Sequence, residues 1–190
     1  PASNGWRLTM RVPGIIPFVL GALLIAPGVI HAEDGYGLWL RYRPVTDSVR
    51  LREYRAALSH VVLPGESPTL RVAREELVRG LRGLLNSAVS IEPSVETSGM
   101  IVAGTRASSD AIGRLVVPDE LERVGPEGFV IRHRRVHNRL VTAIAANSDL
   151  GVLYGVFYLL RSVENLKPLD QLAVFERPHI GLRLLNHWDN

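Results

Sequence analysis

The densest group of residues able to do chemistry stands near the end of the sequence, where Asn186, His187, Trp188 and Asp189 follow an apolar run. If the run is a strand, its end presents an amide, an imidazole, an indole ring and a carboxylate together. Sugar-binding sites combine an aromatic face with surrounding amide and carboxylate hydrogen bonds. The alternative is a surface turn that carries a half-buried tryptophan, and the residue types alone leave both interpretations open.

A basic stretch, Arg132-His133-Arg134-Arg135-Val136-His137, could bind an anion or a nucleic acid backbone. The stretch has the pattern of a strand, however, and a strand sends alternate side chains to opposite faces. We therefore expect a solvated strand surface. His133 and His137 have the four-residue spacing of metal ligands on a helix, but a strand does not pair them and no carboxylate is close in sequence, so no metal is expected.

Two glycine motifs invite functional interpretations. Gly99 to Thr105 is an apolar run with a polar turn after it, but it lacks the lysine and the number of glycines of a phosphate-binding loop. We interpret it as a strand and its terminal turn. Gly151 and Gly155 lie on one face of an expected helix, which favours close contact with another helix or strand over loose packing within the domain.

Composition limits the class of protein. The chain has 190 residues, of which 46% are hydrophobic and 22% charged, which suits one globular domain of ordinary size. It has no cysteine, so disulfides, thiolate metal sites and a cysteine nucleophile are excluded. Arg7 and Arg11 are two of the 22 basic residues, and no acidic residue occurs before Glu33, so the remainder holds 20 basic and 19 acidic residues. This balance argues against nucleic acid as a partner.

The front of the chain has the pattern of a secretory signal peptide. Residues 10–32 comprise a short basic start, an uncharged run and an alanine before the acidic Glu33-Asp34. We expect cleavage after Ala32, an upstream extension at residues 1–9, and a secreted or periplasmic mature protein. A retained membrane anchor is the competing interpretation, and the membrane would then be contacted only through this segment.

The remaining chain alternates strand and helix patterns. Strands are expected at residues 36–42, 60–63, 100–104, 127–136, 140–146 and 180–185. The strands at 127–136 and 140–146 are expected to form an antiparallel hairpin across His137-Asn138-Arg139, in which Asn138 can take a positive φ. Helices are expected at residues 47–58, from Ser67 or Thr69 to Asn86, at 110–115, and after Asn147-Ser148-Asp149 up to Lys167-Pro168. The last helix shows one apolar stripe, formed by Leu150, Leu153, Val156 or Phe157, Leu160 and Val163. These elements predict an α/β (α+β) fold, with two main helices packed on a mixed β-sheet.

Four segments resemble the α-glucuronidases of glycoside hydrolase family 67, namely residues 33–42, 125–131, 145–157 and 182–190. The tyrosine-glycine helix motif is also similar to the amino-terminal domain of β-hexosaminidase-type glycosidases. The resemblance implies an amino-terminal α/β domain at residues 33–178. It also implies that residues 179–190 are the first strand of a truncated (β/α)8 catalytic barrel.

The same resemblance implies the activity. The family removes α-1,2-linked (4-O-methyl)glucuronic acid from xylo-oligosaccharides during xylan degradation, with inversion and without metal or other cofactor. Inverting hydrolysis uses two carboxyl groups about 6.5–9.5 Å apart, and the resemblance places both on the barrel, so no catalytic residue is assigned in this chain. Asn186, His187, Trp188 and Asp189 would contribute to substrate binding.

The leading hypothesis is thus a non-catalytic domain, inactive alone, whose partners are its own barrel and, through the barrel, the substrate. A homodimer of the full enzyme is left open. The alternative is a free-standing carbohydrate-binding or interaction module, and an anion- or nucleic-acid-binding domain is the third hypothesis.

Overall fold

A mixed sheet forms the centre of the part of the chain that the computed structural model describes, residues 40–96, 98–136 and 138–180. Its six strands have the order β2-β1-β3-β5-β4-β6. β2, β1, β3 and β5 are parallel, whereas β4 is antiparallel to both β5 and β6. The strands are β1 His60–Val62, β2 Ser90–Ile91, β3 Met100–Thr105, β4 Phe129–Val136, β5 Arg139–Ala146 and β6 Ala173–Glu176.

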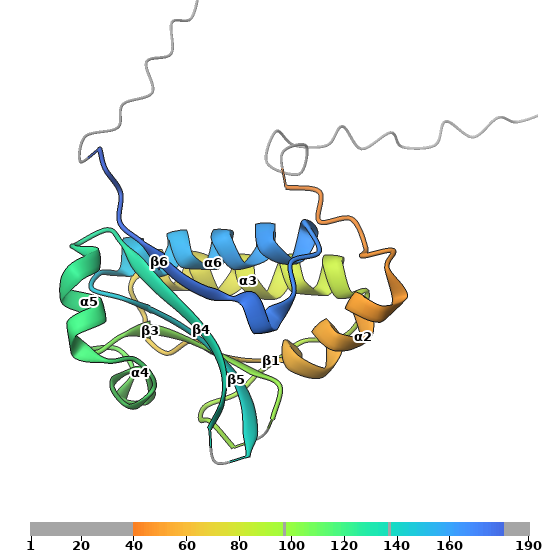
Figure 1. The fold of residues 1–190 in the computed structure, drawn as a ribbon, viewed down its shortest axis with the longest axis horizontal. Coiled ribbons are helices and arrows are strands. Elements are labelled where there is room, and N and C mark those ends of the chain that lie inside the picture. The colour runs from red at the N-terminus through yellow and green to blue at the C-terminus, as the bar shows by residue number, and fades with distance from the viewer. Residues whose placement is uncertain (1–39, 97, 137, 181–190) are drawn as a thin grey trace, which may run out of the picture.

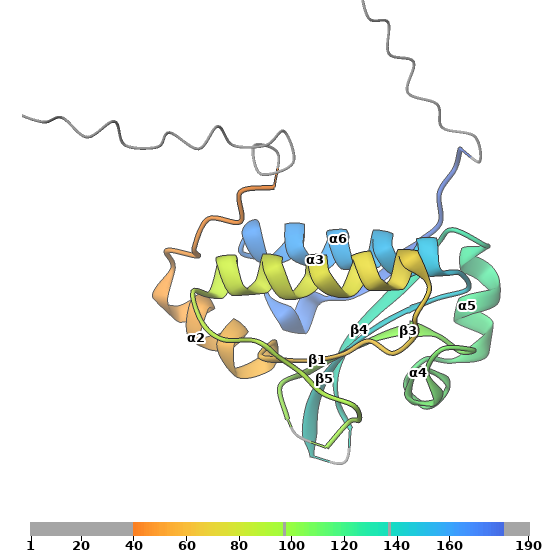
Figure 2. The same ribbon diagram turned by 180° about the vertical axis from the view of Figure 1, so that it is seen from behind.

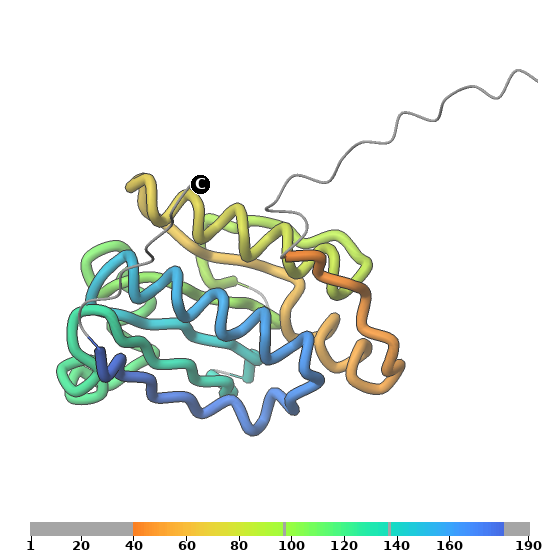
Figure 3. The backbone as a smooth tube through the Cα atoms, turned by 90° about the horizontal axis from the view of Figure 1, so that it is seen from above, coloured from red at the N-terminus to blue at the C-terminus, as the bar shows by residue number. Residues whose placement is uncertain are grey.

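Helices cover both faces of this sheet (Figure 1). The two long helices lie side by side on one face, as the view from above shows (Figure 3), and the two short helices α4 and α5 pack on the other. Each face therefore has its own apolar core. The helical elements are α2 Ser48–Ala57, α3 Pro68–Leu85, α4 Asp110–Leu115, α5 Pro118–Val124, α6 Asp149–Glu164 and the 3₁₀ turn η1 Leu169–Gln171. The predicted α/β class with two main helices on a mixed sheet is confirmed.

Local sequence signals set the ends of α3. Ser67 is the N-cap and its hydroxyl accepts a hydrogen bond from the Leu70 amide at 3.1 Å, with Pro68 in the first turn. Asn86 ends the helix in the left-handed conformation, with φ 45° and ψ 50°. The Ser67 hydroxyl also donates to the Asp149 carboxylate at 2.6 Å, which joins the start of α3 to the first turn of α6.

The predicted apolar face of α6 was partly wrong. Val156, Leu160 and Val163 are buried as expected, but Leu150 is 36% exposed and Leu153 is only half-buried. Compared with the predicted orientation, the helix is rotated about its axis, and Gly151 and Gly155 face the sheet. The other buried apolar residues of the helix are Val152, Val156, Leu159, Leu160 and Val163. A count of bulky apolar residues cannot detect a contact surface made of glycines.

The predicted close contact at these glycines is confirmed, and it is with the sheet. A Cβ atom added at Gly155 would lie 2.4 Å from Ile144 Cγ2 on β5, and one at Gly151 would lie 2.7 Å from the carbonyl oxygen of Gly128. Gly80 of α3 has the same role between the two helices, because its added Cβ would lie 2.7 Å from Leu160 Cδ2. Three glycines thus let α6 approach both β5 and α3.

The strand predicted at residues 36–42 is wrong where it can be compared. Residues 36–39 lie outside the described residues, and Leu40 to Tyr42 form no strand. Tyr42 has φ 40°, which breaks an extended conformation, and its side chain is buried. The segment instead runs along α3, where the Val45 amide donates to the Leu84 carbonyl at 2.9 Å (Figure 2).

The other expectations were largely correct. The helix after Asp47, the strand at 60–63, the strand and turn at 99–109 and the helix at 110–115 all occur, within one to three residues. The hairpin of β4 and β5 also forms, and Asn138 in its turn has φ 65°. The pattern missed α5, β2 and β6, which are short and have weak periodicity.

The strand predicted at 180–185 and the signal segment at 10–32 lie outside the described residues, apart from Ile180, which has no regular structure. Among the described residues, every helix is too short or too polar to cross a membrane. The domain boundaries at 33 and 178 stay predictions.

Gly155→Ala tests the contact between α6 and the sheet. The added methyl group would overlap Ile144, so we expect the free energy of unfolding to fall by about 1–3 kcal/mol, measured by urea denaturation. Gly113→Ala is the matched control. An added Cβ at Gly113 in α4 would meet no atom within 4 Å, so the variant should gain up to about 1 kcal/mol from helix propensity. Equal effects at the two positions would contradict the proposed role of Gly155.

Candidate functional site

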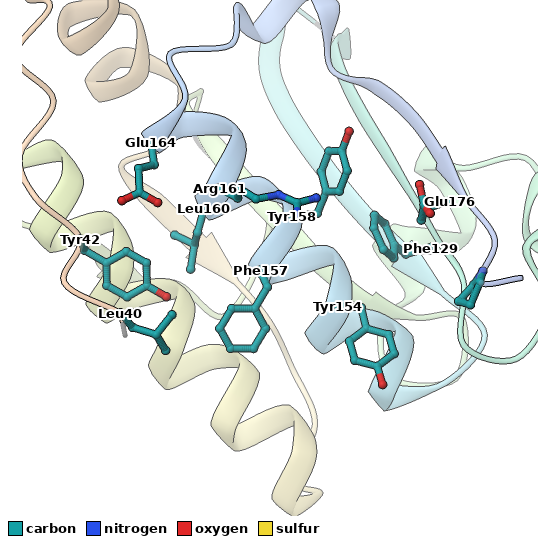
Figure 4. Close-up of a pocket in the computed structure, with 11 residues that line it drawn as sticks. Leu40, Tyr42, Phe129, Tyr154, Phe157, Tyr158, Leu160, Arg161, Glu164 and Glu176 are labelled. Atoms are coloured by element: carbon teal, nitrogen blue, oxygen red, sulfur yellow. The ribbon is translucent and has the colours of Figure 1, made fainter. Parts of the chain in front are cut away.

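A groove along the outer side of α6 combines aromatic and charged side chains on the surface of the described residues. It has a volume of about 550 Å³. Figure 4 shows α6 residues along its length, with Leu40 and Tyr42 to one side of the helix and Phe129 and Glu176 to the other. The lining is Leu40, Tyr42, Phe129, Tyr154, Phe157, Tyr158, Leu160, Arg161, Glu164, Glu176 and Pro178. We call this surface the α6 groove.

Tyr158 anchors one side of the α6 groove. Its ring lies 5.5 Å from that of Phe129, measured between centroids, with a tilt of 58° between the planes. Two cations face the same ring, Arg161 Cζ at 5.3 Å and Lys167 Nζ at 5.3 Å from the centroid. Cation–π contacts of this kind favour one ring orientation. This side of the groove is therefore preorganised.

Tyr42 forms the opposite side and is fixed by a buried carboxylate. Its hydroxyl donates to Glu76 Oε1, and Glu76 is only 3% exposed. Arg79 donates to both oxygens of the same carboxylate, at 2.6 and 2.9 Å. A buried carboxylate needs such partners, so the segment that carries Tyr42 is held against α3. Gly83 makes room for it, since an added Cβ there would lie 2.7 Å from the Tyr42 carbonyl oxygen.

The groove does not provide the arrangement of a glycosidase active site. Its two carboxylates, Glu164 and Glu176, are both exposed. The general acid of a glycosidase lies in apolar surroundings that keep it protonated, and neither of these exposed carboxylates is buried among apolar side chains. The surface is suited to packing against an apolar partner, with charges at its rim.

The site residues predicted from the sequence, Asn186, His187, Trp188 and Asp189, lie outside the described residues. Their substrate-binding role stays a prediction.

The basic stretch on β4 is only in part the solvated strand surface that we expected, since Arg134 and Arg135 are exposed but Arg132 and His133 are half-buried. Arg132 donates to the Val174 carbonyl at 2.9 Å and pairs with Glu120, which joins β4 to β6 and α5. Arg134 donates to the Leu115 carbonyl at the end of α4. These guanidinium groups serve the packing of α4, α5 and β6 onto the sheet, so their side chains are not assembled into one anion site.

His133 points to the other face of the sheet, where its Nδ1 lies 2.8 Å from Thr142 Oγ1. The second histidine of the motif, His137, lies outside the described residues. Within the part of the chain that the structure describes, no group of three or more histidine, aspartate or glutamate side chains could hold a metal ion.

The turn after β3 is closed by its own side chains. The Thr105 amide donates to Ser108 Oγ at 2.9 Å, and the Ser108 amide donates to Thr105 Oγ1 at 3.0 Å. These reciprocal bonds use the hydroxyl groups and amides that a phosphate would require. The interpretation as a strand-end turn is confirmed.

Sequence reasoning missed the α6 groove, although a signal for it exists. Residues 150–160 contain no charged residue, whereas a surface helix ordinarily carries charges on its outer side. The spacing of the apolar residues in this run predicts a single core-facing stripe instead. The glycines take that place, and the aromatic residues are left to line the outer side.

His133 predicts a pH dependence of stability. Burial is the main cause that lowers the pKa of His133 below its ordinary value, and the carboxylates of Glu53 and Asp170 partly oppose it. The His133 imidazole takes up a proton near pH 6.5 in the unfolded chain and only at a lower pH in the folded chain. The contribution of His133 to the free energy of unfolding is therefore complete above about pH 6.5 and is lost as the pH falls towards the pKa of the folded state. His133→Gln should lose less stability than the parent between about pH 7.5 and pH 5.5, measured by urea denaturation. Identical losses would contradict this role.

Comparison with known proteins identifies the family. The model described as "Glycosyl hydrolase family 67 N-terminus" matches residues 38–159. Alpha-glucuronidase A of Aspergillus tubingensis is 28% identical over 184 residues, which is 95% of this chain and 20% of that protein. A probable alpha-glucuronidase A of Aspergillus niger is 30% identical with the same coverage. The chain therefore spans about a fifth of the length of these curated relatives.

Among solved structures, a family GH115 4-O-methyl-α-glucuronidase with specificity for decorated arabinogalactans has 20% sequence identity and a TM-score of 0.45. The match covers 56% of this chain and 13% of that one. The family-67 model covers more than half of the chain and includes the motif segments 125–131 and 145–157 in full and part of 33–42, whereas 182–190 lies outside the matched residues. This chain belongs to glycosyl hydrolase family 67, and it matches the amino-terminal region of the proteins of that family.

Proposed function

We propose that this chain is the amino-terminal, non-catalytic domain of a secreted α-glucuronidase. The whole enzyme would hydrolyse the α-1,2 bond of (4-O-methyl)glucuronic acid on xylo-oligosaccharides. The domain would act as a structural support for a (β/α)8 barrel that begins near residue 180. The match to the amino-terminal family model, in a chain that spans a fifth of its relatives, is the observation that carries this proposal.

The described residues add support from their chemistry. Arg132 and Arg134 of β4 serve packing, the turn after β3 is closed internally, and the carboxylates of the α6 groove are exposed. Hydrolysis with inversion needs one carboxylic acid and one carboxylate on opposite sides of the bond, with a water between. A supporting role agrees with these features better than a catalytic one.

The activity of the separated chain tests this proposal. Residues 33–190 alone should release no uronic acid from aldouronic acids, because the carboxyl pair would be on the barrel. The uninterrupted polypeptide encoded by the same gene should release uronic acid. NMR of the first product should show an inverted anomeric configuration. Release by residues 33–190 alone would refute the proposal, and so would a reading frame that stops at residue 190.

Asn186, His187, Trp188 and Asp189 would line the uronic acid pocket in that enzyme, at the carboxyl end of the first barrel strand. Active sites of such barrels form at the carboxyl ends of their strands. Trp188 would be a wall or stacking residue, and its polar neighbours would donate and accept hydrogen bonds.

Trp188→Ala in the full-length enzyme should lower kcat/KM for uronic acid release by about tenfold, the equivalent of about 1.4 kcal/mol. The loss follows from the removal of a large aromatic contact. Val72→Ala on the exposed outer side of α3 is the control and should leave kcat/KM unchanged. Unchanged kinetics in Trp188→Ala would contradict the assignment.

A further inference from the structure

The outer side of α6 is unusual for a helix at the surface of a domain. Leu153, Tyr154, Phe157 and Tyr158 lie on the side away from the buried strip, and all four are half-buried. Neighbouring α3 lies in the same layer and shows the ordinary pattern, with exposed charges at Arg71, Glu75, Arg79 and Arg82. A helix that is apolar on all sides is typical of one with neighbours on all sides.

We propose that the α6 groove is the surface to which the catalytic domain of the same polypeptide binds, an inference that rests on the proposed function. Phe157 would be the central contact. Arg161 and Glu164, both exposed at the end of the helix, would lie at the rim. The partner surface would be mainly apolar at its centre with polar groups opposite this rim, as in other interfaces between domains.

The position of the two ends of the described part of the chain selects this occupant. Glu176 and Pro178, which precede the last described residue, line the groove, and so do Leu40 and Tyr42 near the first one. Both segments leave on the side of the sheet that carries α3 and α6 (Figure 1). Polypeptide that continues beyond residue 180 therefore starts at the groove, and in the relatives about four-fifths of the length remains to be placed.

The exposed apolar residue next to this exit points the same way. Ile180 is 65% exposed and Pro178 is half-buried against the groove. The polypeptide that follows residue 180 can cover this apolar surface at the least entropic cost. A short connection already holds it nearby, so little translational and rotational freedom is lost when it binds. A second copy of the chain would pay the full cost of association.

Hydroxyl-radical footprinting of two forms, residues 33–190 and the uninterrupted polypeptide of the same gene, tests the proposal. The modification rate of Phe157 and Tyr158 should fall by about fivefold in the longer form, because the centre of an interface is packed as densely as a protein interior. Phe175 is the internal control. It is 39% exposed on β6 under Arg123 of α5, on the other face of the sheet, and its rate should be equal in the two forms.

Variants give a second readout in the uninterrupted polypeptide. Phe157→Ser should lower the midpoint of thermal unfolding of the long form and restore radical access at Tyr158, whereas Phe175→Ser, the same chemical change, should do neither. In residues 33–190 alone, the two variants should differ little from each other.

Each alternative gives a distinct result. If protection of Phe157 in residues 33–190 rises with protein concentration, the groove binds a second copy of the chain. If added xylo-oligosaccharide protects Phe157, the groove binds glycan. Either result overturns the proposal. Equal modification rates of Phe157 in the two forms would also overturn the docking proposal. If the long form were active in that case, the proposed function would stand. An inactive long form with Phe157 protected would refute the function and support the docking surface.

Discussion

The close approach of α6 to the sheet is the contact on which the rest of the domain depends. Gly151 and Gly155 bring the helix backbone against β5 and the loop before β4, and Gly80 brings α3 against the same helix. The core on this face then closes around Val156, Leu160 and the α3 leucines. Side chains of ordinary size at these positions would hold the layers apart, and the dispersion contacts that stabilise a packed interior fall steeply with such a gap.

This arrangement also determines the surface of the domain. Because small residues occupy the side of α6 that faces the sheet, the aromatic residues of the helix are left to the opposite side, where they form the α6 groove with Tyr42 and Phe129. The buried Glu76 and its partner Arg79 fasten Tyr42 at one border, and Tyr158 between Phe129 and two cations forms the other. A rigid, largely apolar surface of this kind is suited to packing against another domain, as the proposed function requires.

The sequence predicted the fold well where local chemistry decides the structure. Ser67, Pro68 and Asn86 mark the ends of α3, Asn138 marks the hairpin turn, and the alternation of β4 and β5 gives their pairing. It failed where long-range contacts decide. Tyr42 leaves the extended conformation because Glu76, far away in sequence, binds its hydroxyl, and β6 forms because β4 offers it a free edge. The α6 groove was missed for a related reason, since the direction of each aromatic side chain depends on which strip of the helix the sheet accepts.

Native-state hydrogen exchange on this chain tests the central claim most directly, because it compares the stability of α6 with that of the sheet beneath it. If the glycine contacts bind the two into one unit, the slowest amides of α6 and of β5 will exchange with the same free energy of opening and the same dependence on denaturant. Exchange of the α6 amides through a separate opening of lower free energy, while the β5 amides stay protected, would contradict the account.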